Sequence, residues 1–177
     1  MPGAEGSLTW SALSSATDLV APNVAAAAAG VPTARVAPIE ATLADTAAFC
    51  AAYDVPLESS ANCVVVLGRR GERTTYAAVL VLATDRADIN GVVRRHLEVR
   101  KISFAPMDDA CALTGMEYGG ITPVGLPSDW EVLIDQAVVA AGPVVIGAGV
   151  RGAKLLVEAS ELAAMPQARV LALALPR

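Results

Sequence analysis

Two runs rich in valine and leucine, joined by a short charged turn, constrain the fold of this chain most strongly. Residues 61–68 (ANCVVVLG) and 74–84 (TTYAAVLVLAT) are each typical of a buried strand. The GRRGER segment between them contains the glycines and charged residues of a turn. The pattern predicts a β-hairpin, so at least part of the sheet must be antiparallel.

Helix and strand patterns are mixed along the rest of the chain. Apolar spacing predicts helices over residues 22–29, 42–53, 85–99 and 106–113, and a helical turn over 160–165. Strands are expected over residues 34–40, 100–105, 131–136, 143–149, 153–159 and 168–174. Residues 1–20 indicate a loose arm with Trp10 and Leu13 as anchors.

This arrangement predicts an α/β or α+β domain with a mixed, largely antiparallel sheet and flanking helices. A length of 177 residues suits one domain with a short extension. We therefore divide the chain into an N-terminal extension, residues 1–40, and a main domain, residues 41–177. The extension is expected either to cover the sheet or to mediate dimer contacts.

The composition is that of a folded protein outside a membrane. Hydrophobic residues make up 54% of the chain and charged residues 18%, which excludes a disordered polymer. No apolar run reaches the length of a membrane span, and the first residues lack the basic region of a secretory signal. We expect a soluble, cytoplasmic protein.

The net charge of −5 argues against broad coating of nucleic acid, yet the charge is uneven. Residues 69–101 contain eight basic and four acidic side chains, a local charge of +4. This third of the chain could face an anion. The alternative is an ordinary solvated helix face.

Several kinds of chemistry are not supported by the sequence. Cys50, Cys63 and Cys111 are widely spaced, which indicates reduced core thiols, and a single histidine, His96, does not support a zinc site. We expect His96 to lie on the surface beside arginines, in contact with phosphate. We expect Asp108-Asp109 to stabilise the start of a helix. The chain has no glycine-rich nucleotide-binding motif and no GxSxG elbow.

The segment EYGGITPVGLP, residues 117–127, contains three glycines and two prolines in eleven positions. Glycine permits close approach to the backbone, and proline fixes it. Residue type alone leaves two interpretations open, namely a rigid connecting loop and a ligand platform made of backbone.

An ordered set of segments extends this observation. DTAAFCAAYDVP, ANCVVV, TYAAVLVLAT and VRKISFAPMDDACALTGMEYGGITPVGLP are followed by VLIDQAV and VVIGAGVRGAKLLV, and LTGxxxGGITPxG (113–125) is the most specific piece. From about Ala44 to Ala174 the chain resembles the YbaK-like family of aminoacyl-tRNA deacylases, which includes the editing domain associated with prolyl-tRNA synthetase. The resemblance implies the fold of that editing domain.

The resemblance also implies an activity, namely hydrolysis in trans of the ester between a wrong amino acid and the 3′ end of tRNA. No metal or organic cofactor is implied. An aminoacyl ester is already activated, so a positioned water can suffice while backbone N–H groups hold the carbonyl oxygen. The platform assigned by the match consists of Gly119 and Gly120, with Pro123 and Gly125 fixing its shape and Gly147 and Gly149 on a second edge. For each glycine the alternative is a turn constraint alone.

The chain departs from the family at one position. Members of the family place a lysine, associated with binding and positioning the aminoacyl-tRNA, near the start of the first hairpin strand, where this chain has Asn62. Asparagine exchanges hydrogen bonds but supplies no cation. Our hypothesis is that Lys154, just after the second glycine turn, supplies the cation. The alternative is that Lys154 is an ordinary surface lysine on an edge strand.

The leading functional interpretation is a free-standing deacylase, whose Arg94, Arg95, Arg100 and Lys101 meet the tRNA backbone. A catalytically silent relative that binds tRNA ends, an aminoacyl small molecule or a protein partner is the alternative, supported by the change to Asn62. A third interpretation is an esterase acting on a small activated amino acid. Besides mischarged tRNA, a second copy of the chain and an aminoacyl-tRNA synthetase are considered as partners. The choice among alanine, cysteine, serine and proline stays open.

Overall fold

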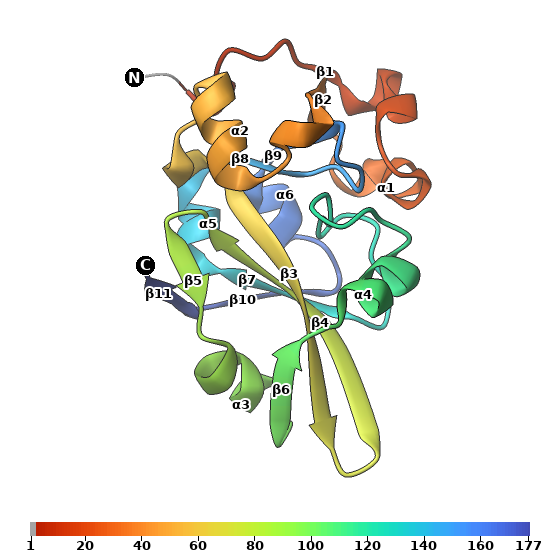
Figure 1. The fold of residues 1–177 in the computed structure, drawn as a ribbon, viewed down its shortest axis with the longest axis vertical. Coiled ribbons are helices and arrows are strands. Elements are labelled where there is room, and N and C mark those ends of the chain that lie inside the picture. The colour runs from red at the N-terminus through yellow and green to blue at the C-terminus, as the bar shows by residue number, and fades with distance from the viewer. Residues whose placement is uncertain (1–2) are drawn as a thin grey trace.

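The computed structural model describes residues 3–177 and contains a five-stranded and a four-stranded sheet with helices around them (Figure 1). The larger sheet has the order β10-β7-β4-β3-β6, the second has the order β1-β2-β9-β8, and β11 pairs with β5. The strands are β1 Ser11–Ala12, β2 Arg35–Pro38, β3 Ala61–Arg70, β4 Arg73–Leu82, β5 Asp85–Ala87, β6 Lys101–Phe104, β7 Glu131–Asp135, β8 Pro143–Gly147, β9 Ala153–Glu158, β10 Ala168–Leu171 and β11 Ala174–Pro176.

The helices are short and lie mostly at the ends of strands. The α-helices are α1 Pro22–Ala26, α2 Thr46–Tyr53, α3 Arg94–His96, α4 Met107–Thr114, α5 Gln136–Ala141 and α6 Ala159–Ala163. Single turns of 3-10 helix are η1 Leu13–Ser15, η2 Thr17–Leu19, η3 Ala28–Gly30, η4 Ala41–Leu43 and η5 Leu57–Ser59, and η6 Ile89–Val93 is a π-helix.

The predicted hairpin is confirmed and forms the centre of the larger sheet. β3 and β4 pair antiparallel from Ala61 opposite Leu82 to Arg70 opposite Arg73. Neighbouring side chains of β3 point into different cores, with Val65 in one cluster and Val66 in another. Because both faces of the hairpin are covered away from its exposed turn, the strands consist of continuous apolar runs in that part.

The predicted fold class is also confirmed. Most strand pairs are antiparallel, and two pairs, β4 with β7 and β7 with β10, are parallel. The crossovers that parallel pairing requires contain helices, so the sheet is mixed and flanked by helices.

Three element predictions are wrong in detail. The helix expected over 85–99 begins later, because Asp85–Ala87 pairs with β11 and the Asp88 carboxylate then caps η6. The strand 131–136 ends at Asp135, which caps an unpredicted helix, α5. The strand expected over 168–174 is divided into β10 and β11.

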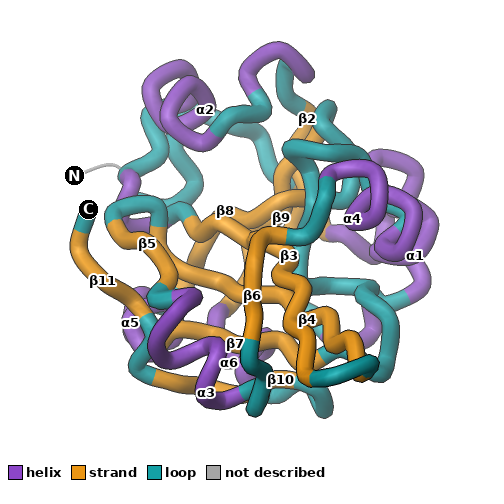
Figure 2. Tube along the Cα trace, turned by 60° about the horizontal axis from the view of Figure 1, so that its bottom comes forward, coloured by secondary structure: helices purple, strands orange, loops and turns teal. Residues whose placement is uncertain are grey.

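The N-terminal arm is ordered, so the prediction of a loose arm is wrong for its described part. β1 pairs with β2, and β2 pairs with β9 of the main domain. Leu13 is a buried anchor, as predicted, while Trp10 packs against a smaller core cluster. Figures 1 and 2 both show α1 beside α4, so the extension reaches the segment that precedes the glycine loop.

Within residues 3–177, no helix combines the length and the apolar character needed to cross a bilayer.

Candidate functional site

The glycine loop that follows α4 is bonded to the turn between β8 and β9. The Glu117 amide donates to the Gly149 carbonyl over 2.9 Å, and the Gly149 amide donates to the Gly120 carbonyl over 2.7 Å. The two segments touch closely, because a Cβ at Gly147 would lie 2.6 Å from the Gly120 carbonyl oxygen. A Cβ at Gly120 would likewise lie 2.6 Å from the carbonyl carbon of Val150. Both glycines are therefore required for this packing.

Gly119 and Gly120 have different surroundings. Gly120 is buried and its amide donates to the Glu117 carbonyl over 3.0 Å. Gly119 is exposed with φ +86°, and among residues 3–177 no acceptor is assigned to its amide. Pro123 is buried farther along the loop. The free donor of the platform is thus Gly119, while Gly120 joins the loop to the neighbouring turn.

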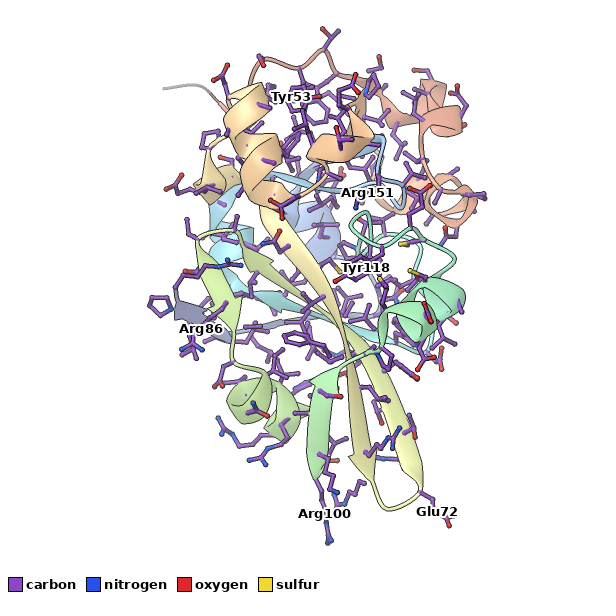
Figure 3. All side chains as sticks on the ribbon, viewed as in Figure 1. Tyr53, Glu72, Arg86, Arg100, Tyr118 and Arg151 are labelled. Atoms are coloured by element: carbon purple, nitrogen blue, oxygen red, sulfur yellow. The ribbon has the colours of Figure 1, made fainter. Side chains whose placement is uncertain are left out.

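Arg151 is a cation that lies against Gly119, and the sequence analysis did not single it out. Its Nη1 donates to the Tyr118 carbonyl over 3.3 Å, and its Nη2 donates to the Ala41 carbonyl over 3.1 Å. A Cβ at Gly119 would lie 2.4 Å from Nη1, so the guanidinium lies directly against this glycine. Figure 3 shows Arg151 and Tyr118 in the same region of the molecule. The sequence signal that could have identified Arg151 was its position in the GAGVRG turn, where Gly147 and Gly149 were already candidates.

Asn62 lies under the start of α2. The Thr46 hydroxyl donates to the Asn62 side-chain carbonyl over 2.5 Å, which leaves the Asn62 amide group as a donor. The carboxylate of Asp45, the residue before α2, accepts from the backbone amides of the first turn, so Thr46 is held in place.

Lys154 is buried, and the surface interpretation of this residue is wrong. The side chain is 7% exposed, its amine donates to the Ala44 carbonyl over 3.1 Å, and the amine lies 5.0 Å from the centre of the Phe49 ring. Burial lowers the pKa of Lys154 from its usual value, and the positive charge of Arg151 adds to this effect. Lys154 and Asn62 thus converge on residues 44–46, but no hydrogen bond from the amine to the glycine loop is assigned among the described residues.

We expect Lys154→Met to raise stability at neutral pH by on the order of 1 kcal/mol, since it removes a buried charge and keeps the length of the side chain. The folded-state pKa is lowered, so the unfolded chain binds the proton more strongly. The free energy of unfolding of the wild type therefore rises with pH in the window between the folded-state pKa and 10.5. The difference in free energy of unfolding between Lys154→Met and the wild type should therefore decrease as the pH rises through that window. Urea unfolding of both proteins at several pH values checks this, and a difference that does not change with pH would contradict it.

The N-terminal extension supports the glycine loop from the other side. The Asn23 side-chain amide donates to the carbonyls of Thr114 and Gly125 over 2.6 and 2.9 Å. The Ala21 amide donates to the Ala148 carbonyl over 3.2 Å. Residues outside the region of strongest resemblance therefore fix both ends of the loop and the neighbouring turn.

Part of the predicted anion surface forms a groove at the outer edge of β6. The cavity has a volume of about 580 Å³ and its lining includes four basic residues. We call it the basic groove, and its cations are Arg69, Arg94, Arg100 and Lys101. Arg95, although exposed, is not among the residues that line the cavity. Figure 3 places Arg100 at the lower end of the molecule, away from Arg151. The structure therefore brings the tRNA-backbone candidates together without Arg95 and separates them from the glycine loop.

The remaining candidates have structural roles. The His96 Nε2 lies 2.7 Å from a Glu131 carboxylate oxygen, so the histidine contacts an acidic partner instead of the expected anion surface. Burial raises the pKa of Cys63 to about 12 and also raises that of Cys50, so both are thiols at neutral pH. The two aspartates 108 and 109 lie in the first turn of α4, as expected.

Known structures share the fold described above. One solved structure, described as a "putative trans-editing enzyme for prolyl tRNA synthetase", superimposes with a TM-score of 0.74 at 22% identity and covers 86% of this chain and 95% of that chain. A second, described as hypothetical protein APE2540, gives a TM-score of 0.72 at 22% identity and covers 81% of this chain and 92% of that chain. The molecule therefore has the fold of these editing-domain neighbours.

The family follows from the sequence. Residues 40–165 match the aminoacyl-tRNA editing domain family, and the chain belongs to it. No curated protein sequence matches the chain. The resemblance inferred from the motifs is confirmed.

Proposed function

We propose that this protein hydrolyses, in trans, the ester that joins a wrong amino acid to the 3′ end of a tRNA. The observation that carries the proposal is the pair of donors at the glycine loop. The exposed Gly119 amide has no assigned acceptor within residues 3–177, and the Arg151 guanidinium lies against the same glycine. Such donors stabilise the negative charge that develops on an ester oxygen when water attacks.

The reaction requires no nucleophile from a side chain. A water oxygen bonds to the ester carbon, and the bond from that carbon to the ribose oxygen breaks. The ribose oxygen takes a proton that the water gives up, so the products are the free amino acid and the tRNA with its terminal hydroxyl restored. We assign the Gly119 amide and Arg151 to the ester carbonyl oxygen. The free amide group of Asn62 is assigned to positioning the substrate, because the Thr46 hydroxyl already occupies its carbonyl. Lys154 holds residues 44–46 in place through the Ala44 carbonyl, and we assign it a positioning role as well.

A second function, binding of tRNA ends without hydrolysis, is favoured by one observation. The family lysine is replaced by Asn62, and the nearby Lys154 amine is buried and bonded to a backbone carbonyl. Neither residue then offers a free cation to the substrate.

Amino-acid release from a panel of tRNAs mischarged with alanine, cysteine, serine or proline separates these functions. If the protein is a deacylase, at least one of these tRNAs should release its amino acid. Asn62→Lys should then increase the rate of release, because it restores the cation. Binding without release from any tRNA would favour the second function. Hydrolysis of small amino-acid esters at the same rate without tRNA would instead indicate a small-molecule esterase.

We further propose that the basic groove binds phosphates of the tRNA. Arg94→Ala should weaken tRNA binding and reduce the slope of log K against log salt concentration by about 0.9, the loss of one phosphate contact to a duplex. Arg95→Ala is the matched control, because Arg95 is the next residue of α3 but does not line the groove. Fluorescence anisotropy at several salt concentrations measures both variants. Equal effects of the two substitutions would contradict the assignment to the groove.

Mischarged tRNA is thus the main proposed partner, in the cytoplasm. A second copy of the chain and an aminoacyl-tRNA synthetase are the protein partners to be sought, by sedimentation of the free protein and by mixing with purified synthetases.

A further inference from the structure

Exposed apolar side chains are concentrated in one segment of the chain. Of the six large hydrophobic residues that are exposed among residues 3–177, four lie between positions 104 and 118. They are Phe104, Met107, Leu113 and Tyr118. The two aromatic residues are the most exposed, at 63% and 59%, whereas Phe49 and Trp130 are buried. Exposed aromatic and apolar side chains concentrated in one segment of a small protein point to a binding surface.

This segment joins the basic groove to the glycine loop. β6 begins at Lys101, which lines the groove, and ends at Phe104, about 10 Å farther along at the usual rise of a strand. α4 follows, and its loop leads to Tyr118, whose carbonyl accepts from Arg151. In Figure 3, Tyr118 lies between Arg100 at the lower end of the molecule and Arg151 above it.

The charges along the segment from the basic groove to the glycine loop determine which part of a nucleotide can bind there. Between Lys101 and Arg151 the sequence contains no lysine or arginine. Asp108 and Asp109 lie exposed within the same interval, whereas the Glu117 carboxylate accepts from the Arg151 amide over 2.8 Å at its end. We therefore expect phosphates to be attracted to the basic groove and to be repelled by Asp108 and Asp109, within the segment that contains the exposed aromatic side chains. Aromatic rings bind single-stranded nucleic acid by stacking on its bases.

We propose that Phe104 and Tyr118 are stacking surfaces for unpaired bases at the 3′ end of an RNA, between phosphates held in the basic groove and the terminal ester at Gly119. The inference rests on the proposed function and specifies how its substrate is bound. It explains why a 63% exposed phenylalanine lies at the end of an edge strand.

The test uses two RNA hairpins that imitate an acceptor stem, one with a four-nucleotide single-stranded 3′ ACCA end and one blunt. We expect Phe104→Ala and Tyr118→Ala each to weaken binding of the overhanging hairpin by about 5- to 150-fold, the range known for removal of one stacked base contact. Binding of the blunt hairpin should not change, because it uses the groove alone. Phe104→Trp should retain the affinity, since it keeps an aromatic face.

Val170→Ala is the matched control, as Val170 is a similarly exposed apolar residue, on β10. Unchanged affinity in Phe104→Ala, or equal losses on the two hairpins, would overturn the proposal. The result is separable from the proposed hydrolysis. Release of amino acid by the wild type together with unchanged RNA affinity in both variants would leave the hydrolysis intact and refute the stacking. Binding that depends on the overhang and is weakened in both variants, without release of amino acid by the wild type, would support the stacking and refute the hydrolysis.

Discussion

Gly120→Ala should reduce amino-acid release from the best tRNA of the panel by about 100-fold. The new Cβ would lie 2.6 Å from the carbonyl carbon and oxygen of Val150, both backbone atoms that cannot rotate away. The glycine loop must therefore move away from the β8–β9 turn and take the neighbouring Gly119 amide with it. A displacement of 1 Å in a catalytic arrangement is enough to cost about 100-fold in rate. Single-turnover release measured at saturating protein checks the effect on the chemical step.

Gly152→Ala is the control for this prediction. Gly152 lies in the same turn, but a Cβ there would have no atom within 4 Å. This variant should release the amino acid at the rate of the wild type. Thermal unfolding of both variants shows whether the fold is kept, because overpacking alone typically costs about 1–3 kcal/mol. A folded Gly120→Ala protein with wild-type release would exclude the platform as the hydrolytic site.

Local patterns predicted the parts of the fold that depend on neighbouring residues. The hairpin of β3 and β4 was readable because both strands are continuous apolar runs around a short turn. The glycine loop was readable because close backbone approach leaves glycine as the residue that fits. In both cases the physical cause lies within a few residues of the pattern.

Contacts between distant segments were not readable from such patterns. Arg151 bonds Ala41 and Tyr118, which are 110 and 33 positions away, so its role depends on how the sheets meet. Lys154 resembles an exposed lysine of an edge strand, but β9 lies between β2 and β8, and Phe49 of α2 covers the lysine. The basic groove likewise joins β3, η6 and β6, and this arrangement excludes Arg95 although Arg94 and Arg95 are adjacent.

The same limitation applies at Asp135, where the sequence indicated a continuing strand but the carboxylate connects three segments. One of its oxygens accepts from the amides of Leu173 and Ala174 over 2.9 and 3.0 Å, and the other accepts from the Ala137 amide over 2.8 Å. Asp135 therefore ends β7, begins α5 and fixes the C-terminal segment between β10 and β11.

Asp135→Ala should lower the free energy of unfolding by about 4 kcal/mol. The side chain is 3% exposed, and its removal leaves three backbone donors without their charged acceptor, at about 1–3 kcal/mol for each unsatisfied group. The midpoint of thermal unfolding should fall by about 10 °C, given about 2–4 °C per kcal/mol in a chain of this size. Asp135→Asn keeps the shape and one acceptor, so its loss should be intermediate. Asp129→Ala, at an exposed position, should stay within about 0.5 kcal/mol of the wild type. Equal losses in Asp135→Ala and Asp129→Ala would mean that the three hydrogen bonds do not stabilise the fold.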